Sequence, residues 1–461
     1  MRSSANSAIS PPESFPRWLA HWPVMVAVCL LVALPLLFVA RGEKSEWNDC
    51  YYTATSHLLR HEPMHHAGES YAYPPSMALV AVGLGAMPLK WSLAVWGAIN
   101  ALATVVTFAC AWRLIGGTPL KTASRQSLLI FALGTVLAVR WIVSPLEHQQ
   151  FDMVIAALVM LGCSAIVARC DVRGGLALGI AASMKCTPLL FAPYLAWRGR
   201  WLAALCVAIG AVGMNVLPDF LFPKTSGGWY VVDWYQVFIG DVSKTASGMW
   251  HSDLALNQSI GGWWNRYFRV GFPTAIENLQ AIDLGPTALA WVKRLTHGTS
   301  LLLVGLTAII GGRAFRDPAE ETSSIDGRIA EENSRSTYAE LWGIEFAAIC
   351  CLMLMMSPMS SKAHYVVLWL PCLLLARNAI ARPNVWRWTA LSLLLVTGTL
   401  TTKGLIGKFI GDLTLMWGFP TFFALATLVT LWGEHRAVKA RASSIATRDQ
   451  HGSAAATRRA A

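Results

Sequence analysis

Residues 23–40, PVMVAVCLLVALPLLFVA, form an apolar stretch without a single charged side chain. An α-helix rises about 1.5 Å per residue, so a stretch of this length reaches across a bilayer core. Residues 413–432, LTLMWGFPTFFALATLVTLW, have the same character near the other end of the chain. Both stretches predict helices that cross a membrane.

The composition of the whole chain agrees with these two stretches. Of its 461 residues, 55% are hydrophobic and 14% are charged, and the mean hydropathy is +0.46. Soluble domains carry about 25% charged residues. The net charge of +11 resides in short loops and at the C-terminus, which is typical of cytoplasmic anchoring rather than of nucleic-acid binding. We therefore expect an all-α polytopic membrane protein with no nucleic-acid partner.

The apolar stretches predict about twelve passes when the basic loops are kept on the cytoplasmic side. Residues 1–22 are then a cytoplasmic N-terminal tail, and residues 23–433 form one transmembrane domain. Residues 434–461 are basic and rich in alanine and serine, and we expect a disordered cytoplasmic tail.

Two of the apolar stretches do not fit a simple span. Residues 74–87 are short for a crossing and predict a helix at the membrane surface. Residues 174–197 are interrupted by Lys185 and Pro188 and lie between basic loops, so they predict a broken hairpin of two short helices. Irregular backbone at membrane depth is tolerated only beside protein or a water-filled cavity, so we expect a cavity next to Lys185.

This orientation puts the polar clusters of the chain on the non-cytoplasmic side, with long outer loops at residues 42–73 and 218–286. We expect the plasma (inner) membrane, with the active site facing the outside or the periplasm. Lys403 and Lys408 are exceptions to the positive-inside tendency, because they too fall on the outer side.

The first two polar clusters are residues 46–52, EWNDCYY, and residues 147–152, EHQQFD. Asp49 in the first cluster could act as a general base toward a sugar hydroxyl, or it could cap the helix that follows. The amides, imidazole and carboxylate of the second cluster suit hydrogen bonding to sugar hydroxyls. Ordinary capping at a helix end is the alternative for the second cluster.

The other two clusters are Lys185 within MKCTP and residues 357–364, SPMSSKAH. An ionisable side chain inside a membrane segment is a functional hypothesis by default, and Lys185 could neutralise a lipid phosphate. The alternative is that Lys185 extends to the interface. Lys362 and His364 could bind phosphate or assist proton transfer, and the alternative is an ordinary polar turn.

No nucleotide-binding loop occurs in the chain, and no CxxC pair suggests a metal site. Nucleotide sugars are cytoplasmic, so a sugar donor used on the outer face is better supplied as a lipid phosphate. We expect neither a metal nor another cofactor.

Taken in order, the clusters resemble the polyprenol-phosphate-mannose-dependent mannosyltransferases of glycosyltransferase family 87, which have the GT-C fold. Members typically carry an early Asp followed by Tyr and Ala, then Y-P-P, H-G-Q-x-N, K-x-x-P, N-Q-S and S-P-x-S-W-x-H-H. The matching segments here are DCYYTA from Asp49, YPP from Tyr73, HQQFD from His148, KCTP from Lys185, NQS from Asn257 and SPMS from Ser357, ending in His364.

Four positions depart from the family pattern. Gln149 replaces the glycine of the third motif and Asp152 replaces its asparagine. Ser361 stands in place of the tryptophan of the last motif, and Ala363 replaces the first of its two histidines. These departures leave open a different sugar or acceptor, or reduced activity.

The resemblance implies an inverting transfer of a hexose, usually mannose, from polyprenyl monophosphate to a lipid-linked or glycan acceptor. By analogy Asp49 is the base and His364 pairs with Asp49 or the acceptor, while Lys185 and Lys362 hold the leaving phosphate. The residues that the analogy assigns to the sugar or acceptor are Tyr73, His148, Gln150, Asp152, Asn257 and Gln258. A metal is not obligatory, because the leaving group is already a phosphate.

The main alternative is a polytopic transporter or flippase of a glycolipid, which would also have broken helices and an intramembrane charge. Transporters place polar residues near mid-membrane, whereas here the polar residues gather at the outer loops. A structural membrane subunit is a further alternative, and it would have no need of Asp49.

Overall fold

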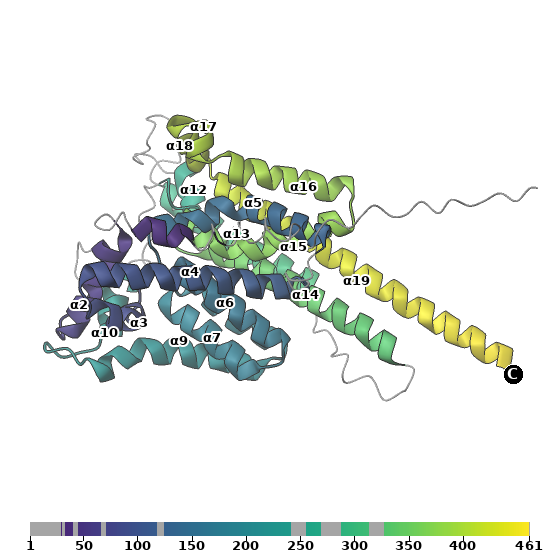
Figure 1. Cartoon of the computed structure of the whole chain (residues 1–461), viewed down its shortest axis with the longest axis horizontal. Coiled ribbons are helices and arrows are strands. Elements are labelled where there is room, and N and C mark those ends of the chain that lie inside the picture. Colours follow the sequence, from purple (N-terminus) through teal and green to yellow (C-terminus); the bar gives the residue numbers. More distant parts are fainter. Residues whose placement is uncertain are drawn as a thin grey trace, which may run out of the picture.

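A computed structural model describes residue 29 and residues 33–39, 45–65, 71–117, 124–240, 255–268, 287–312 and 327–460. Across these residues the regular secondary structure is entirely helical, and no strand is present. In the described part of the chain, six helices are long and apolar enough to cross a membrane, and a bent pair near the C-terminus makes up to seven. The long helices run side by side along the longest axis of the molecule (Figure 1).

The helices in chain order are η2 (Trp47–Tyr52), α2 (Thr53–Leu59), α3 (Pro75–Gly85), α4 (Leu89–Leu114), α5 (Arg125–Glu147), α6 (Asp152–Val167), α7 (Asp171–Met184), η4 (Thr187–Leu190), α8 (Phe191–Trp197), α9 (Trp201–Leu221), α10 (Tyr230–Trp234), η5 (Tyr235–Ile239), α12 (Ile260–Phe268), α13 (Ala288–Gly311), α14 (Gly327–Met356), η8 (Lys362–Leu368), α15 (Trp369–Ala381), α16 (Val385–Leu395), η9 (Val396–Leu400), α17 (Lys403–Ile406), α18 (Lys408–Met416) and α19 (Phe419–Ala460).

One half of the bundle is built from α4, α6, α7 and α9, which pack in that order (Figure 1). The most extensive contact between described helices joins α7 to α9, where a side chain on Gly179 would lie 2.7 Å from the Val207 carbonyl oxygen. Small residues let membrane helices approach closely, and packing rather than water exclusion stabilises such contacts in lipid. The glycine-rich sequence of α7 therefore explains why the two backbones can touch.

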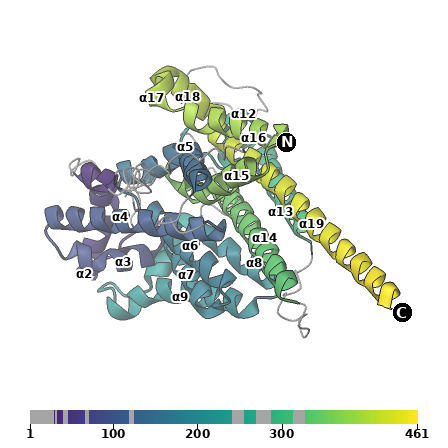
Figure 2. The same cartoon turned by 45° about the vertical axis from the view of Figure 1, so that its right-hand side comes forward.

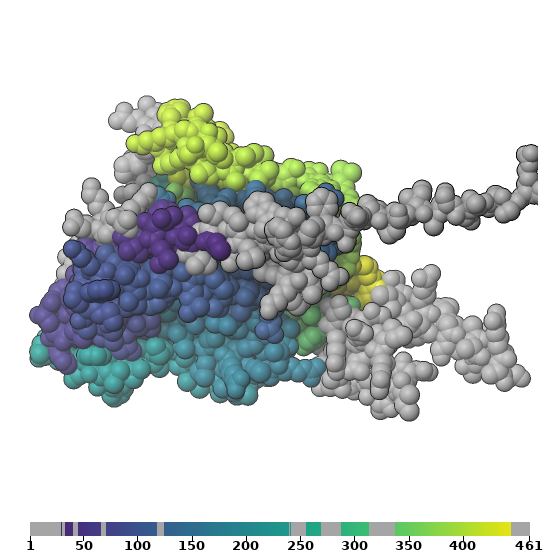
Figure 3. Space-filling view, in the orientation of Figure 1, coloured from purple at the N-terminus to yellow at the C-terminus, as the bar shows by residue number. Residues whose placement is uncertain are grey.

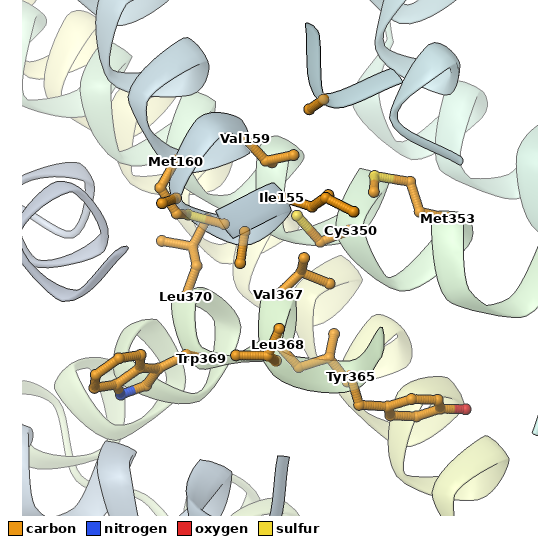
Figure 4. Close-up of a cluster of buried hydrophobic side chains, with 14 of the residues drawn as sticks. Ile155, Val159, Met160, Cys350, Met353, Tyr365, Val367, Leu368, Trp369 and Leu370 are labelled. Carbon is orange, nitrogen blue, oxygen red and sulfur yellow. The ribbon is translucent and has the colours of Figure 1, made fainter. Parts of the chain in front are cut away.

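The other half contains α5, α14, α15, α16 and α19, with α15 against α5 and α14 against α19 (Figure 2). The two halves meet at α6, α14 and η8. Ile155 and Met160 of α6, Met353 of α14 and Val367 of η8 contribute to a buried apolar cluster there (Figure 4). Ile155, Met353 and Val367 of this cluster also line the pocket of the polar site described next.

Short helices gather at one end of the bundle, namely α2, α3, α10, α12, α17 and α18, while the end of α19 projects at the other (Figure 1). Between these ends, Glu345 of α14 accepts hydrogen bonds from Tyr194 of α8 and from Arg198, the residue that follows α8, and it contacts His435 of α19 at 2.9 Å. Tyr194 Oη lies 2.7 Å and Arg198 Nε 2.8 Å from Glu345 Oε2. This buried ion pair fastens α8 and α19 to α14.

The broken hairpin predicted for residues 174–197 is present as α7, η4 and α8, with Lys185 at the break. The short helix predicted at residues 74–87 is α3. The number of passes is not confirmed at twelve, because several apolar helices are only 10–17 residues long. Most of the first predicted pass, residues 23–40, and the whole tail of residues 1–22 lie outside the described residues.

Two features near the C-terminus differ from the expectation. The stretch at residues 413–432 is not one straight helix, because α18 and α19 meet at a bend of 56°. Gly418 at this bend has a φ of 77°, a left-handed conformation that ends helices. Residues 434–460 continue α19 as helix, where a disordered tail was expected. The alanine-rich composition of this segment favours helix.

Candidate active site

Lys185 occupies the break between α7 and η4. Its backbone is extended, with φ −152° and ψ 118°, so α7 ends at Met184. Pro188 follows within the next turn and lacks the backbone N–H that a continuing α-helix would bond to the Met184 carbonyl. The sequence therefore interrupts the helix here and directs a lysine side chain inward from the break.

Lys185 forms a buried ion pair with Asp152. Lys185 Nζ lies 2.7 Å from Asp152 Oδ1, and the two side chains are 13% and 5% exposed. Asp152 is the first residue of α6, where the positive end of the helix dipole favours a carboxylate. The pair therefore joins the start of one helix to the end of another across 33 residues of sequence.

His364 lies on the other side of Asp152. Its Nδ1 accepts a hydrogen bond of 3.1 Å from the backbone N–H of Ser361. Since Nδ1 is an acceptor, the imidazole is neutral and carries its proton on Nε2. His364 Nε2 lies 3.9 Å from Asp152 Oδ2, so Asp152 stands between a lysine and a histidine.

A small pocket opens at this cluster. Its polar lining consists of Asp152, Lys185, Thr187, Ser360 and His364, and its apolar lining of Ile155, Met353, Leu354 and Val367. Figure 4 shows the apolar floor, where Ile155, Met353 and Val367 come from three different helices. The enclosed space is on the order of one water molecule, so in this conformation the pocket is too small for a sugar.

Glu46 is a carboxylate near this cluster that was not among the predicted site residues. Gln150 donates a short hydrogen bond to Glu46 through its side-chain amide, and the backbone N–H of Glu46 donates to His148 O at 3.2 Å. Burial raises the pKa of Glu46 above its ordinary value, and nearby Asp152 adds to the rise. In the sequence, the only feature that pointed to Glu46 was its position three residues before Asp49.

Aromatic packing fixes the segment that carries Glu46. Trp47 is fully buried, stacks on Trp96 at 4.5 Å and donates a hydrogen bond to Ser92. Phe151, beside Asp152, packs against Trp96 at 4.4 Å. The same set of rings reaches Tyr73, whose ring centre is 5.9 Å from Lys185 Nζ. Tyr73 and Gln150 therefore both belong to the surroundings of the Asp152–Lys185 pair.

Asp49 and His148 are exposed. Asp49 accepts a 3.3 Å hydrogen bond from the side chain of Asn48, its neighbour in η2. Because η2 is a π-helix, with more residues per turn than an α-helix, positions three apart do not share a face. His148 directly follows α5, and its Nδ1 contacts the Ser144 carbonyl at 2.9 Å. No contact joins either side chain to Lys185 in the described part of the chain.

Asn257 and Gln258 are fully buried and bonded to backbone. Asn257 Oδ1 accepts from the backbone N–H of Ser360 at 3.2 Å, and its Nδ2 donates to Pro358 O at 3.1 Å. The backbone N–H of Gln258 donates to Ser360 O at 2.6 Å. These two amides hold the turn that leads into His364.

Lys362 has a different set of neighbours from Lys185. The charged groups close to Lys362 are Arg140, Lys403, Glu147 and Asp412, whereas those close to Lys185 are Asp152 and Glu46. The structure thus brings together Lys185, Asp152, His364, Tyr73 and Gln150 of the predicted set, and it separates Lys362 from them.

The family model of glycosyltransferase family 87 matches residues 71–318, more than half of the chain. The chain belongs to glycosyltransferase family 87. The resemblance deduced from the ordered motifs is therefore confirmed. The matched range of this family member includes Tyr73, Asp152, Lys185 and Asn257, while the segments that carry Asp49 and His364 lie outside it.

One curated relative matches the family 87 chain over 336 residues with 25% identity. It is the "Polyprenol-phosphate-mannose-dependent alpha-(1-2)-phosphatidylinositol pentamannoside mannosyltransferase" of Mycolicibacterium smegmatis (strain ATCC 700084 / mc(2)155). The match covers 70% of this chain and 66% of the relative, just under two thirds of its length. No solved structure matches the chain significantly.

Proposed function

We propose that the chain is a membrane glycosyltransferase that moves a hexose, mannose by analogy with its relative, from polyprenyl monophosphate to a lipid-linked or glycan acceptor. The observation that carries the proposal is the buried Asp152–Lys185–His364 cluster at a helix break. It lines a pocket in a chain whose family transfers sugars. The proposed orientation puts this pocket on the non-cytoplasmic face of the plasma membrane.

The reaction is a displacement at the anomeric carbon of the donor. An acceptor hydroxyl oxygen forms the new bond to that carbon while the bond to the phosphate oxygen breaks, and attack from the opposite face inverts the configuration. The hydroxyl proton passes to a base, and polyprenyl monophosphate leaves with the bonding electrons. The enzyme therefore needs a base on one side of the sugar and positive charge on the other.

Lys185 is the cation best placed for the leaving phosphate. Its ammonium group is buried, and a positive charge held in a site of low dielectric stabilises a developing phosphate charge far better than one in water. In the absence of substrate Asp152 neutralises Lys185, so the arriving phosphate competes with Asp152 for the same ammonium group. Asp152 and His364 Nε2 then become available to hydroxyl groups of the sugar.

Asp49 is the proposed base by the resemblance, and its exposed carboxylate has no ion-pair partner in the described structure to displace. Glu46 is the alternative base, because it is nearer to the Asp152–Lys185 pair and its pKa is raised by burial. A base works best when its pKa lies close to the working pH. Asp49→Asn and Glu46→Gln are therefore the two variants to compare.

Asn257 and Gln258 act in this proposal as positioning residues, because the Asn257 side-chain amide and the Gln258 backbone N–H hold the turn before His364. Tyr73, His148 and Gln150 are proposed to contact the sugar or acceptor once the pocket has widened. The resemblance implies that Lys362 holds the donor phosphate, whereas its charged neighbours, Arg140 and Lys403 among them, favour a separate role.

The test uses the purified full chain in lipid nanodiscs with radiolabelled mannosyl polyprenyl phosphate and a lipid extract as the source of acceptors. Transfer of label to a new glycolipid by the wild type, but not by Lys185→Met, supports the proposal. If the folded wild type moves no label from any polyprenyl-phosphate sugar, the proposal fails. A flippase would instead move the intact donor across a vesicle membrane without forming a new glycolipid.

A further inference from the structure

A second group of cations lies beside α5, apart from Lys185. Arg140 of α5 is only 8% exposed, and its guanidinium lies 5.0 Å from the Trp141 ring centre. Its Nη1 donates to Gly398 O at 2.9 Å and to Thr401 Oγ1 at 2.8 Å. Across the described residues, no carboxylate forms an ion pair with Arg140. A buried charge that lacks a counter-ion is costly, and in a membrane segment it marks a path for a ligand.

Two lysines share the surroundings of Arg140. Lys362 begins η8, which packs against α5, and Lys403 follows two residues after Thr401, the hydrogen-bond partner of Arg140. Arg140, Lys403, Glu147 and Asp412 are the charged groups that act on Lys362. Lys403 is already paired with Asp412. No described carboxylate forms an ion pair with Lys362. Among the described residues, the charged groups around Lys362 therefore include more positive than negative side chains, which favours the binding of an anion.

The adjacent helices are suited to the membrane interface. Lys403 and Lys408 begin α17 and α18, which form a raised part of the surface (Figure 3). Large apolar side chains are exposed on and beside these short helices: Leu405, Phe409, Ile410 and Trp417. Lysines beside exposed aromatic and aliphatic side chains are typical of segments that lie among lipid headgroups.

We propose that Arg140, Lys362 and Lys403 form a second anion site, separate from the Lys185 pocket, that binds the phosphate group of a membrane lipid. The lipid reaches the site from the interfacial surface of α17 and α18, with its phosphate between α5 and η8. The inference rests on the proposed function only for the side of the membrane that this end of the bundle faces. A lipid-phosphate site at this end of the bundle would explain why basic residues accumulate on the non-cytoplasmic side, where the positive-inside tendency predicts few basic residues.

Two sources of lipid phosphate fit this site. A phosphodiester would belong to a phospholipid or to a lipid acceptor with a phosphorylated headgroup, whereas a phosphomonoester would belong to the polyprenyl carrier. The two are distinguished by binding, without any sugar transfer. The delipidated full chain in neutral detergent is titrated with phosphatidylglycerol, with polyprenyl monophosphate and with inorganic phosphate, and bound lipid is counted by native mass spectrometry.

The decisive variants are Lys362→Gln and Arg140→Gln. Lys362→Gln is the safer of the two, because Lys362 makes no hydrogen bond or ion pair with the described residues whose loss could unfold the protein. Lys408→Gln is the matched control, since Lys408 is exposed on the same surface but is not among the charged groups close to Lys362. We expect a site for one lipid whose affinity falls at least about tenfold in Lys362→Gln and is unchanged in Lys408→Gln.

If the decisive variants weaken the binding of phosphatidylglycerol alone, the site belongs to a phosphodiester lipid. If they weaken the binding of polyprenyl monophosphate alone, the site belongs to the carrier. Equal affinity of the wild type and both decisive variants for both lipids would overturn the proposal, as would binding of inorganic phosphate only. Because no sugar transfer is measured, a chain that binds lipid but transfers nothing would refute the proposed function and leave this site intact.

Discussion

Lys185 Nζ lies 2.7 Å from Asp152 Oδ1 in a setting that is almost closed to solvent. Such a pair costs free energy to desolvate, and the cost is recovered only while both charges are present. A protein that needed only stability could fill this space with apolar side chains. The buried pair is thus a better indication of a site than of a structural support.

The first prediction concerns this pair. Lys185→Met leaves Asp152 buried without its counter-charge, so we expect a loss of about 3–5 kcal/mol in the free energy of unfolding. Transfer should fall by about 100-fold or more, because the leaving phosphate loses its cation. The double variant Lys185→Met, Asp152→Asn should regain most of the stability and none of the activity. Thermal unfolding and the transfer assay measure the two effects. Recovery of activity in the double variant would contradict the role of Lys185.

The second prediction separates the two nitrogens of His364. In His364→Asn the side-chain oxygen can still accept from the Ser361 N–H, but nothing replaces Nε2. In His364→Gln the amide nitrogen can replace Nε2, but the bond to Ser361 is lost. We expect Asn to be the more stable variant and Gln the more active one. The reverse order of activities would mean that the turn, rather than the proton on Nε2, matters to the reaction.

The third prediction identifies the base. Asp49→Asn should lower the rate of transfer by about 10²–10⁴-fold, the usual contribution of general base catalysis, and leave the melting temperature unchanged, since Asp49 is exposed. Glu46→Gln should lower transfer much less. The two rates are compared at saturating donor. If Glu46→Gln shows the larger loss, then Glu46 is the base and the analogy with the family motif does not hold at Asp49.

The fourth prediction is a pH dependence of stability. Burial raises the pKa of Glu46 above its ordinary value of 4.5, so the folded protein prefers the protonated carboxyl. The resulting penalty on folding is absent below the unfolded pKa and complete above the raised folded pKa. Glu46→Gln removes this penalty and can still accept from Gln150. It should therefore melt higher than the wild type at pH 7.5, with a difference that shrinks toward pH 4.5. A difference that stays constant across this range would argue against a raised pKa.

The fifth prediction concerns the backbone at Gln149, where the family motif has glycine. This residue has a φ of 55°, the left-handed region in which glycine is favoured. Gln149 also donates from its side chain to Phe38 O at 2.8 Å. Gln149→Gly and Gln149→Ala both lose that bond, so their difference reports the backbone alone. We expect Gly to be more stable than Ala by about 1 kcal/mol in thermal unfolding. Equal stabilities would show that φ relaxes when the side chain is removed.

The sequence alone predicted much of the local structure. Charge depletion and the length of the apolar stretches predicted an all-helical membrane protein, because a helix must satisfy its own backbone within lipid. The break at Lys185 followed from Pro188, and the order of the motifs led to the family. These features depend on neighbouring residues, whose effects can be assessed without knowing how the helices pack.

Only the tertiary structure decided which of the predicted side chains meet. Asp152 contacts Lys185 because α6 packs against α7, and it faces His364 because η8 packs against α6. The same packing directs Lys362 toward Arg140, although Lys362 and His364 are only two residues apart. Residues on one short helix face different directions, so proximity in sequence did not predict a shared site. The sequence determined where the helices begin and break, and the packing of those helices determined which charges lie together.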